Sequence, residues 1–269
     1  MLSYNSPAKL NLFLHTIQKR EDGFTEILSF FQAVDLQDTI QIQKAEKDEL
    51  TCSHPSIPLD SSNTILRALD LFREKTNLST PVHIHLEKKI PIEAGLGGGS
   101  SNAATTLWAL NELFQQKLSN TTLQEWGAEI GSDVPFFFAT GQALVKGRGE
   151  IIEPLHLEKF FSCWLAKPEF GLSAKEVYQA LDFSKVPKRS FLENIDSMEY
   201  VNDLEIPAFA LQPRLRKIRE HLLNMGFSQV VMTGSGSTFF CLGNVTPKPI
   251  DDLSYYSVQG TQRTFTSWY

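Results

Sequence analysis

Four glycines gather in the stretch Pro91-Ile92-Glu93-Ala94-Gly95-Leu96-Gly97-Gly98-Gly99-Ser100-Ser101. Before it, the alternation of apolar and polar residues over positions 82–86 predicts a strand. After it, apolar residues recur every three or four positions over 103–114, which predicts a helix. Glycine permits positive φ angles and close approach of the backbone, and the N–H groups at the start of a helix attract phosphate. The arrangement therefore predicts a phosphate-binding loop, with Ser100 and Ser101 capping the helix.

The loop lacks the residues that define the common phosphate-binding motifs. A Walker A loop requires a lysine before its serine or threonine, whereas Ser100 follows Gly99 directly. The dinucleotide-binding pattern needs its third glycine where Ser100 stands, and protein-kinase signatures of the HRD and DFG kind do not occur in the sequence. A flexible strand-to-helix turn is the alternative, although one or two glycines suffice for a turn.

The composition is that of a globular protein with an acidic surface. The 269 residues suit one large or two modest domains, and 42% of them are hydrophobic, enough for a buried core. A formal net charge of −6 argues against a nucleic-acid partner, which would require a basic footprint. Apolar runs are too short for a membrane span, so no membrane partner is expected.

Cysteine usage and the amino-terminal sequence indicate the compartment. Cys52, Cys163 and Cys241 lie far apart and form no CxxC pair, which argues against a zinc site or a disulfide framework. The first apolar run is short and is flanked by Lys9 and His15, so no signal peptide is expected. We therefore expect a cytoplasmic protein.

The rest of the chain mixes helical and strand patterns without strict βαβ alternation. This mixture favours an α+β fold over a doubly wound sheet. A domain boundary near Pro154 would divide the chain into residues 1–153 and 154–269. Further strands are predicted over residues 10–15, 27–34, 39–43, 143–145, 151–152, 230–232 and 239–242, and further helices over residues 61–72, 123–130 and 215–225.

Three segments in chain order resemble motifs of the GHMP kinases, a family that includes galactokinase, homoserine kinase and mevalonate kinase. They are Ser6-Pro7-Ala8-Lys9-Leu10-Asn11-Leu12, the glycine-rich residues 91–101, and Thr233-Gly234-Ser235-Gly236-Ser237-Thr238. The resemblance implies an amino-terminal domain similar to ribosomal protein S5 domain 2 and a ferredoxin-like carboxyl-terminal domain. It also implies that ATP, the co-substrate, lies in the cleft between them on residues 91–101, together with Mg²⁺.

Within this family, three segments are similar to kinases of the non-mevalonate route to isoprenoid precursors. They are Pro7-Ala8-Lys9-Leu10-Asn11-Leu12-Phe13-Leu14, Arg20-Glu21-Asp22-Gly23 and Gly131-Ser132-Asp133-Val134-Pro135-Phe136. Such kinases phosphorylate the 2-hydroxyl of a cytidine diphosphate-linked methylerythritol, and a monomer or weak homodimer is expected. The resemblance is weakest over residues 154–213. Two alternatives remain: a GHMP kinase for homoserine or a mevalonate derivative, and a non-catalytic nucleotide or sugar sensor.

Asp133 and Lys9 are the candidate catalytic residues. Asp133 lies between a predicted helix stop at Gly131 and Pro135, where an ordinary turn aspartate is the alternative. Phosphoryl transfer needs a group to take the hydroxyl proton, and the resemblance assigns that role to Asp133. It places Lys9 beside Asp133, where an ammonium group favours the ionised carboxylate and orients the acceptor hydroxyl.

For three further features of the sequence, two alternative roles each remain open. Ser101 is expected either to bind Mg²⁺ through its hydroxyl or only to cap the helix. The glycines of residues 233–238 either let the backbone approach the substrate or phosphates or connect two strands tightly. Asn63 is assigned either to the adenine, by a weak resemblance, or to a helix cap.

The resemblance assigns Asn11, Phe24, Thr25 and Tyr178 to the acceptor. Asn11 would bind methylerythritol hydroxyls, and the two aromatic rings would stack on the cytosine, although each ring taken alone is typical of a core residue. The family pattern after Asp-Gly is Tyr-His, whereas this chain has Phe24 and Thr25. A phenyl ring still stacks, but threonine lacks an imidazole, so we expect an altered side-chain contact with the pyrimidine edge, which the Thr25 backbone can still read.

Overall fold

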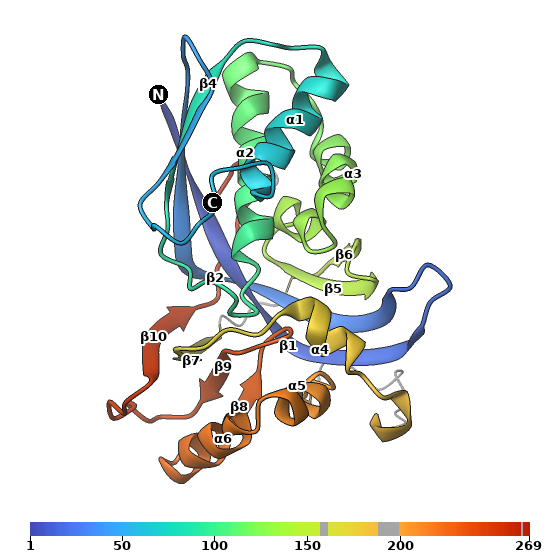
Figure 1. Cartoon of the computed structure of the whole chain (residues 1–269), viewed down its shortest axis with the longest axis vertical. Helices are drawn as coiled ribbons and strands as arrows, with labels where there is room; N and C mark the ends of the chain where they lie inside the picture. The colour runs from blue at the N-terminus through green and yellow to red at the C-terminus, as the bar shows by residue number, and fades with distance from the viewer. Residues whose placement is uncertain (157–160, 188–198, 265) are drawn as a thin grey trace.

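The computed structural model describes residues 1–156, 161–187, 199–264 and 266–269. Two β-sheets form the scaffold, and they follow one another along the long axis of the molecule (Figure 1). Helices pack against both sheets, and most strand pairs are antiparallel. The predicted α+β class is confirmed.

The larger sheet has the strand order β3-β4-β2-β5-β6, with β1 paired to β2. Its pairs are antiparallel except for β3 with β4, which are parallel. Its strands are β1 (Leu2–Lys19), β2 (Thr25–Lys44), β3 (Glu49–Cys52), β4 (Val82–Glu87), β5 (Gln142–Gly147) and β6 (Ile151–Pro154).

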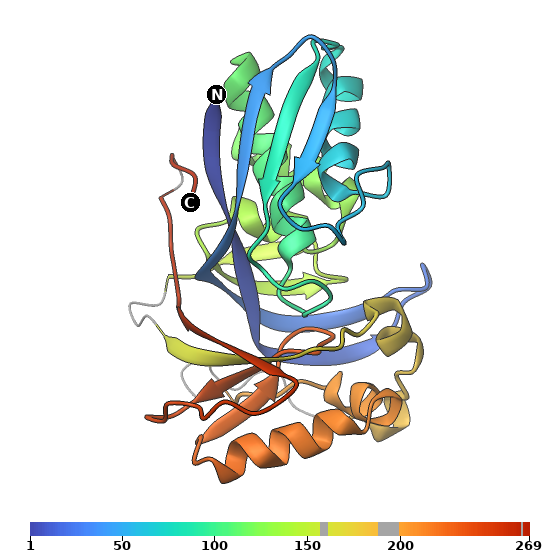
Figure 2. The same ribbon diagram turned by 60° about the vertical axis from the view of Figure 1, so that its left-hand side comes forward.

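Strands β1 and β2 form one long hairpin that reaches from the larger sheet to the smaller one (Figure 2). The two strands predicted over 27–34 and 39–43 are both parts of β2, because pairing with β1 continues through the polar residues between them, including Ser6 opposite Asp38. Register shifts near Pro7, Asn11 and Thr16 interrupt the ladder. Such irregularities bend a strand, and they accompany the change in direction of this hairpin.

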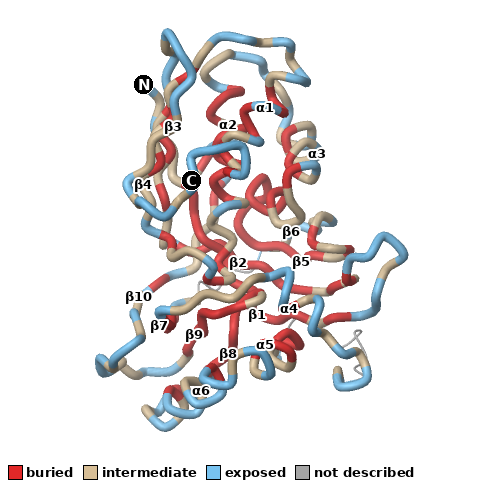
Figure 3. Tube along the Cα trace, viewed as in Figure 1, coloured by how far each residue is buried: buried red, intermediate tan, exposed pale blue. Residues whose placement is uncertain are grey.

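Helices cover one face of the larger sheet. They are α1 (Thr64–Thr76), α2 (Gly98–Phe114), α3 (Asn120–Ile130) and the 3₁₀ helix η1 (Val134–Phe138). The Asn63 side chain accepts a 2.9 Å hydrogen bond from Ile65 N, so it caps α1. Helix α3 ends at Gly131, as predicted. Fully buried rings such as Phe72 and Phe136 fill the space beneath these helices, whose inner faces are buried (Figure 3).

The smaller sheet is antiparallel, with the order β10-β7-β9-β8. Its strands are β7 (Ser162–Pro168), β8 (Gln229–Met232), β9 (Phe239–Leu242) and β10 (Leu253–Gln259), and the short helices near it are α4 (Ala174–Gln179), η2 (Phe183–Lys185), α5 (Glu205–Leu211) and α6 (Arg214–Asn224). Leu10 and Phe30 of the long hairpin share one buried cluster with Leu165 and Phe240 of this sheet. The two sheets are therefore joined by a common apolar core.

The end of the chain returns to the larger sheet after β10. Thr261 N donates to Ala33 O at 2.8 Å, and the Trp268 indole donates to Asn5 O at 2.8 Å. The buried Arg263 guanidinium donates to the carbonyl oxygens of Phe137 (3.3 Å) and Phe138 (2.7 Å), both in η1. We call residues 261–264 and 266–269 the carboxyl-terminal strap. The boundary near Pro154, where β6 ends, stays a prediction, because this strap belongs spatially to the first sheet.

The helices and strands expected from the sequence agree in type with those observed. Seven further elements of the described residues were not predicted, namely β3, β7, β10, α4, α5 and the 3₁₀ helices η1 and η2. In the part of the chain that the structure describes, no helix combines the length and apolar character needed to cross a membrane.

Candidate active site

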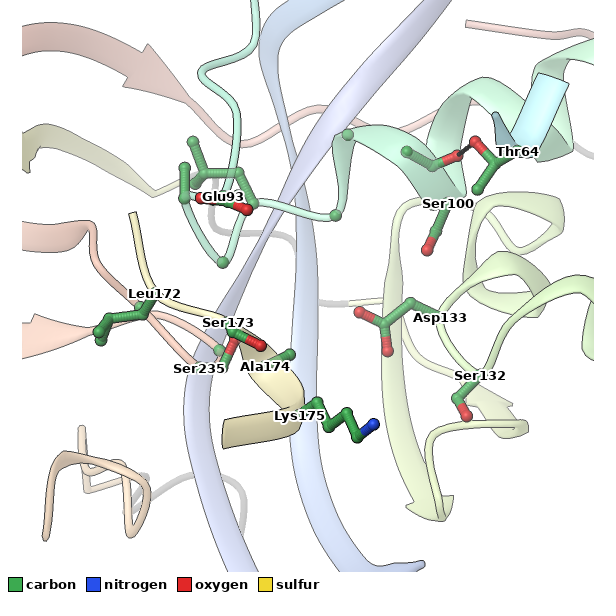
Figure 4. Close-up of a pocket in the computed structure, with 18 of the residues that line it drawn as sticks. Thr64, Glu93, Ser100, Ser132, Asp133, Leu172, Ser173, Ala174, Lys175 and Ser235 are labelled. Carbon is green, nitrogen blue, oxygen red and sulfur yellow. Dashed lines mark hydrogen bonds between the residues drawn. The ribbon is translucent and has the colours of Figure 1, made fainter. Parts of the chain in front are cut away.

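A cavity of about 940 Å³ opens where the long hairpin, the glycine-rich loop and the smaller sheet meet. Its lining comes from segments far apart in the chain: β1, β2, the loop before α2, the turn before η1, α4 and the loop between β8 and β9. Figure 4 shows the side chains of Ser100, Asp133 and Lys175 pointing into the same space from the start of α2, the turn before η1 and α4. All the predicted site residues except Ser101 line this cavity.

The glycine-rich loop starts α2 without a side-chain cap. Gly97 is the N-cap residue, with φ of 68°, and no side chain accepts a hydrogen bond there. The prediction that Ser100 and Ser101 cap the helix is therefore wrong. The left-handed turn at Gly97 starts the helix at Gly98, so both serines already lie inside its first turns. A helix start that lacks a side-chain cap, on the wall of a cavity, is suited to binding phosphate through backbone N–H groups.

A second glycine loop, residues 233–238, packs backbone against backbone on the first. Gly95 has φ of 72°, and a Cβ there would lie 2.2 Å from Thr233 O. A Cβ on Gly234 would likewise lie 2.8 Å from Gly95 O. The loop also connects β8 to β9 tightly, because Thr233 N donates to Thr238 O at 2.9 Å. The tight strand connection is confirmed, and Gly234 and Gly236 also line the cavity. Approach of this backbone to the substrate or phosphates stays a prediction.

Lys9 and Asp133 lie side by side in the cavity. Lys9 Nζ is 3.3 Å from Asp133 Oδ2 and 2.6 Å from Asn11 Oδ1, and it lies 4.4 Å from the centre of the Phe31 ring. The Lys9 side chain is 4% exposed and that of Asp133 is 30% exposed. The ammonium group is therefore fixed by its neighbours, whereas the carboxylate remains accessible to a ligand.

The glycine-rich loop rests directly on Lys9. Lys9 N donates to Leu96 O at 2.9 Å, and a Cβ on Gly97 would lie 2.8 Å from Lys9 Cγ. Only a glycine at position 97 leaves room for the lysine side chain. The phosphate-binding element and the lysine–aspartate pair are thus parts of one packed unit.

Asn11 ties the pair to its surroundings. Its Nδ2 donates to Ser29 Oγ at 2.9 Å, and its backbone N donates to Thr233 Oγ1 at 2.9 Å. The amide is 1% exposed, so its orientation is set by these bonds and by Lys9. Asn11 lines the cavity next to the pair.

Two aromatic rings occupy the other side of the cavity. Phe24 follows the hairpin turn and is 47% exposed, which is unlike a core residue, and the Arg148 guanidinium lies 4.9 Å from its ring centre. Its backbone N donates to Asp22 Oδ1 at 3.0 Å, which fixes the turn. Tyr178 of α4 also lines the cavity, and both its burial and the nearby charge of Asp133 raise the pKa of its hydroxyl. Thr25 lies at the buried start of β2 and faces the same space.

The cavity is cationic although the protein is acidic. Among the residues that the structure describes, its charged side chains are the cations Lys9, Lys19, Lys88, Arg148 and Lys175 and the carboxylates of Glu93 and Asp133. Five positive groups against two negative ones suit a polyanionic ligand. Sequence reasoning missed four of the cations. The setting of Arg148 between Gly147 and Gly149 was a usable signal, because glycines often mark backbone that approaches a ligand.

Ser101 lies behind the cavity wall. It is fully buried, and its hydroxyl accepts a 2.9 Å hydrogen bond from Ser6, whereas Ser100 faces the cavity. The Mg²⁺ role of Ser101 stays a prediction. The described residues contain no group of three or more metal-binding side chains. Mg²⁺ usually takes only one or two protein carboxylates, with water and substrate phosphates completing its shell, so the carboxylates of Glu93 and Asp133 on one cavity are compatible with it.

The fold, the glycine-rich loop without a Walker lysine and the adjacent lysine–aspartate pair are typical of one class of enzyme, the small-molecule kinases. The chain belongs to the GHMP kinase family: residues 63–141 match the family described as GHMP kinases N terminal domain, and residues 184–249 match GHMP kinases C terminal. Members of this family use ATP as a co-substrate. The resemblance read from the sequence motifs is confirmed.

Two curated relatives carry the same enzyme name. The chain is 45% identical over 266 residues to 4-diphosphocytidyl-2-C-methyl-D-erythritol kinase of Protochlamydia amoebophila (strain UWE25), covering 98% of this chain and 91% of that protein. It is 40% identical over 291 residues to the chloroplastic enzyme of the same name from Arabidopsis thaliana, covering 98% of this chain and 75% of the relative.

Solved structures agree with the fold. A crystal structure of 4-(cytidine 5'-diphospho)-2C-methyl-D-erythritol kinase superposes with a TM-score of 0.79 at 31% identity, covering 96% of this chain and 99% of the other. Homoserine kinase from Cytophaga hutchinsonii ATCC 33406 gives a TM-score of 0.67 at 16% identity, covering 97% of this chain and 95% of the other. The second likeness concerns the fold alone.

Proposed function

We propose that this chain transfers the γ-phosphate of ATP to the 2-hydroxyl of 4-diphosphocytidyl-2-C-methyl-D-erythritol, giving the 2-phosphate and ADP in non-mevalonate isoprenoid precursor biosynthesis. The names of the relatives support the acceptor. The observation that carries the proposal is the 3.3 Å pair of Lys9 and Asp133, held in one cavity against the glycine-rich loop. Residues 91–100 and the start of α2 hold the nucleotide phosphates in this proposal.

Asp133 acts as the base in the proposed reaction. The acceptor oxygen attacks the γ-phosphorus, the new O–P bond forms as the bond to the bridging oxygen of ADP breaks, and the hydroxyl proton passes to Asp133. Lys9 positions Asp133 and orients the attacking oxygen, because its ammonium group lies between Asp133 and Asn11. Mg²⁺, when bound, neutralises charge on the phosphates.

The acceptor's nucleoside end is proposed to lie between the aromatic rings. Phe24 is exposed on the cavity and Tyr178 faces it from α4, so both are placed to stack on a cytosine. Thr25 stands where the family pattern has a histidine, and it contacts the pyrimidine edge through its backbone groups. Asn11 binds the hydroxyls of the methylerythritol. Arg148 and Lys175 supply positive charge for the diphosphate.

We also propose a cytoplasmic enzyme that acts as a monomer or weak homodimer, without a nucleic-acid partner. The net charge of −6 and the three free cysteines support this proposal. Burial raises the pKa of the Cys241 thiol to about 12, so this thiol stays protonated and unreactive at neutral pH.

The test is ADP production with this acceptor, ATP and Mg²⁺, run beside acceptor-free, cytidine diphosphate, homoserine and mevalonate controls. Replacing Asp133 with asparagine should lower kcat by about 100-fold or more, because the base is lost. Asp182→Asn makes the same chemical change outside the cavity and should leave kcat unaltered. Turnover of Asp133→Asn close to that of the parent enzyme would remove Asp133 from the role of base, and turnover of homoserine or mevalonate alone would overturn the acceptor.

A further inference from the structure

Asp38 is a fully buried carboxylate that the reaction itself does not use. It lies in β2 with 0% exposure and is not part of the cavity lining. Four donors surround it: Lys89 N (2.7 Å) and Ile90 N (2.8 Å) bond Oδ1, and Lys88 Nζ (2.8 Å) and Asn102 Nδ2 (2.9 Å) bond Oδ2. Both carboxylate oxygens are therefore satisfied, as a buried charge requires.

These donors come from the two ends of the glycine-rich loop. Lys88 to Ile90 immediately precede the loop, and Asn102 lies in α2 directly after it. The network continues behind the loop, since Asn102 Nδ2 also bonds Ser6 Oγ at 2.9 Å. One carboxylate thus fixes the distance between the point where the chain enters the loop and the point where the helix leaves it.

Asp38 also places a cation at the start of α2. Lys88 lines the cavity, and its Nζ lies 3.3 Å from where a Cβ on Gly98, the first residue of the helix, would stand. Burial lowers the pKa of Lys88, and the charge of Asp38 opposes that effect. Without the carboxylate, the ammonium group would keep only the carbonyl oxygen of Ile90, to which it also donates (2.5 Å), and it would lose the charge that opposes the effect of burial.

We propose that Asp38 is a positioning residue for the phosphate donor: it fixes both ends of the glycine-rich loop and holds Lys88 at the start of α2, so it controls affinity for ATP while leaving acceptor binding and the transfer step unchanged. Asp38 touches neither substrate and acts through Lys88, the loop backbone and Asn102. The inference rests on the kinase activity proposed above, but its test uses direct nucleotide binding.

The experiment compares Asp38→Asn with the parent enzyme and with Asp48→Asn. Asp48→Asn is the control, because it removes a carboxylate from the same region of the sheet. Like Asp38, Asp48 bonds a cation (Arg73) and a backbone N–H (Val82 N), but it lies outside the cavity. Calorimetry gives the Kd of a non-hydrolysable ATP analogue, steady-state kinetics give KM for each substrate and kcat, and thermal melting monitors folding. Loss of a charge-assisted contact should raise the analogue's Kd and the KM for ATP by about 10-fold in Asp38→Asn.

The KM for the acceptor and kcat at saturation should stay within about twofold, and Asp48→Asn should bind nucleotide like the parent. If Asp38 had a purely structural role, its replacement would change the KM for ATP, the KM for the acceptor and kcat together, or would change none of them. Either outcome overturns the proposal. If Asp38→Asn does not fold, Lys88→Met decides: unchanged nucleotide affinity in that variant refutes the inference. If the parent enzyme did not turn over the acceptor, only the proposed function would be refuted. The Kd of the ATP analogue for Asp38→Asn relative to that for the parent does not depend on the acceptor, so it still tests the role of Asp38.

Discussion

Replacing Gly95 with alanine tests whether the two glycine loops depend on their close contact. The new Cβ would lie 2.2 Å from Thr233 O and 3.0 Å from Gly236 N, both backbone atoms that cannot rotate away. Reaching an ordinary carbon contact requires the loops to separate by about 1 Å. The left-handed φ of 72° adds a penalty of about 1 kcal/mol for a non-glycine residue. With overpacking of about 2 kcal/mol, the expected loss of stability is about 3 kcal/mol.

Thermal melting and kinetics measure the two consequences. For a protein of this size the expected loss lowers Tm by about 8 °C, and a displacement of about 1 Å beside the reacting groups lowers kcat/KM by about 100-fold. Gly99→Ala is the stability control, because a Cβ there would lie an ordinary 3.6 Å from Thr64 Oγ1 and alanine favours a helix. A Gly95→Ala enzyme that melts and turns over like the parent would refute the reasoning that this contact shapes the cavity.

Two further predictions concern pH and the aromatic platform. Hydrogen bonds from Arg73 hold the pKa of Asp48 below its ordinary value, so the stability that this carboxylate contributes is present at neutral pH and is lost as the pH falls through its folded pKa. At pH 7 the free energy of unfolding of Asp48→Asn should therefore be about 1 kcal/mol lower than that of the parent, which thermal melting measures. This difference should shrink below about pH 4, and a difference that stays constant with pH would contradict the assignment. Phe24→Leu should raise the KM for the acceptor by about 10-fold and leave the KM for ATP unaltered, while Phe24→Tyr retains the parent value, because stacking needs an aromatic face. If Phe24→Leu and the parent enzyme had the same KM for the acceptor, Phe24 would not contact the cytosine.

Elements with a strong period were predictable from the sequence. The alternation before the glycine-rich loop and the helical spacing after it locate β4 and α2, since burial of one face imposes each pattern. The two halves of β2 were not joined, because Asp38 reads as a polar interruption. Its burial is stabilised by donors from residues 88–90 and from Asn102, which only tertiary structure brings together.

The site was predictable where residues lie within a motif. Lys9 and residues 91–101 were found from such motifs, but local spacing cannot reveal that Lys9 supports Gly97. The expected cap at Ser100 was wrong, because a glycine in the left-handed conformation starts α2 earlier. Arg148 and Lys175 were missed, since isolated cations on short segments resemble solvated surface residues until the fold directs them to a cavity.

The carboxyl-terminal strap has a consequence for the backbone that carries the proposed base. Arg263 donates to the carbonyl groups of η1, the segment that directly follows Asp133, so a guanidinium far away in the sequence secures the backbone beside this aspartate. Arg263 is not part of the cavity lining, and Trp268 holds the same strap against Asn5. A substitution in the strap would therefore reach the proposed base through the backbone of η1 alone, without altering any side chain that faces the cavity.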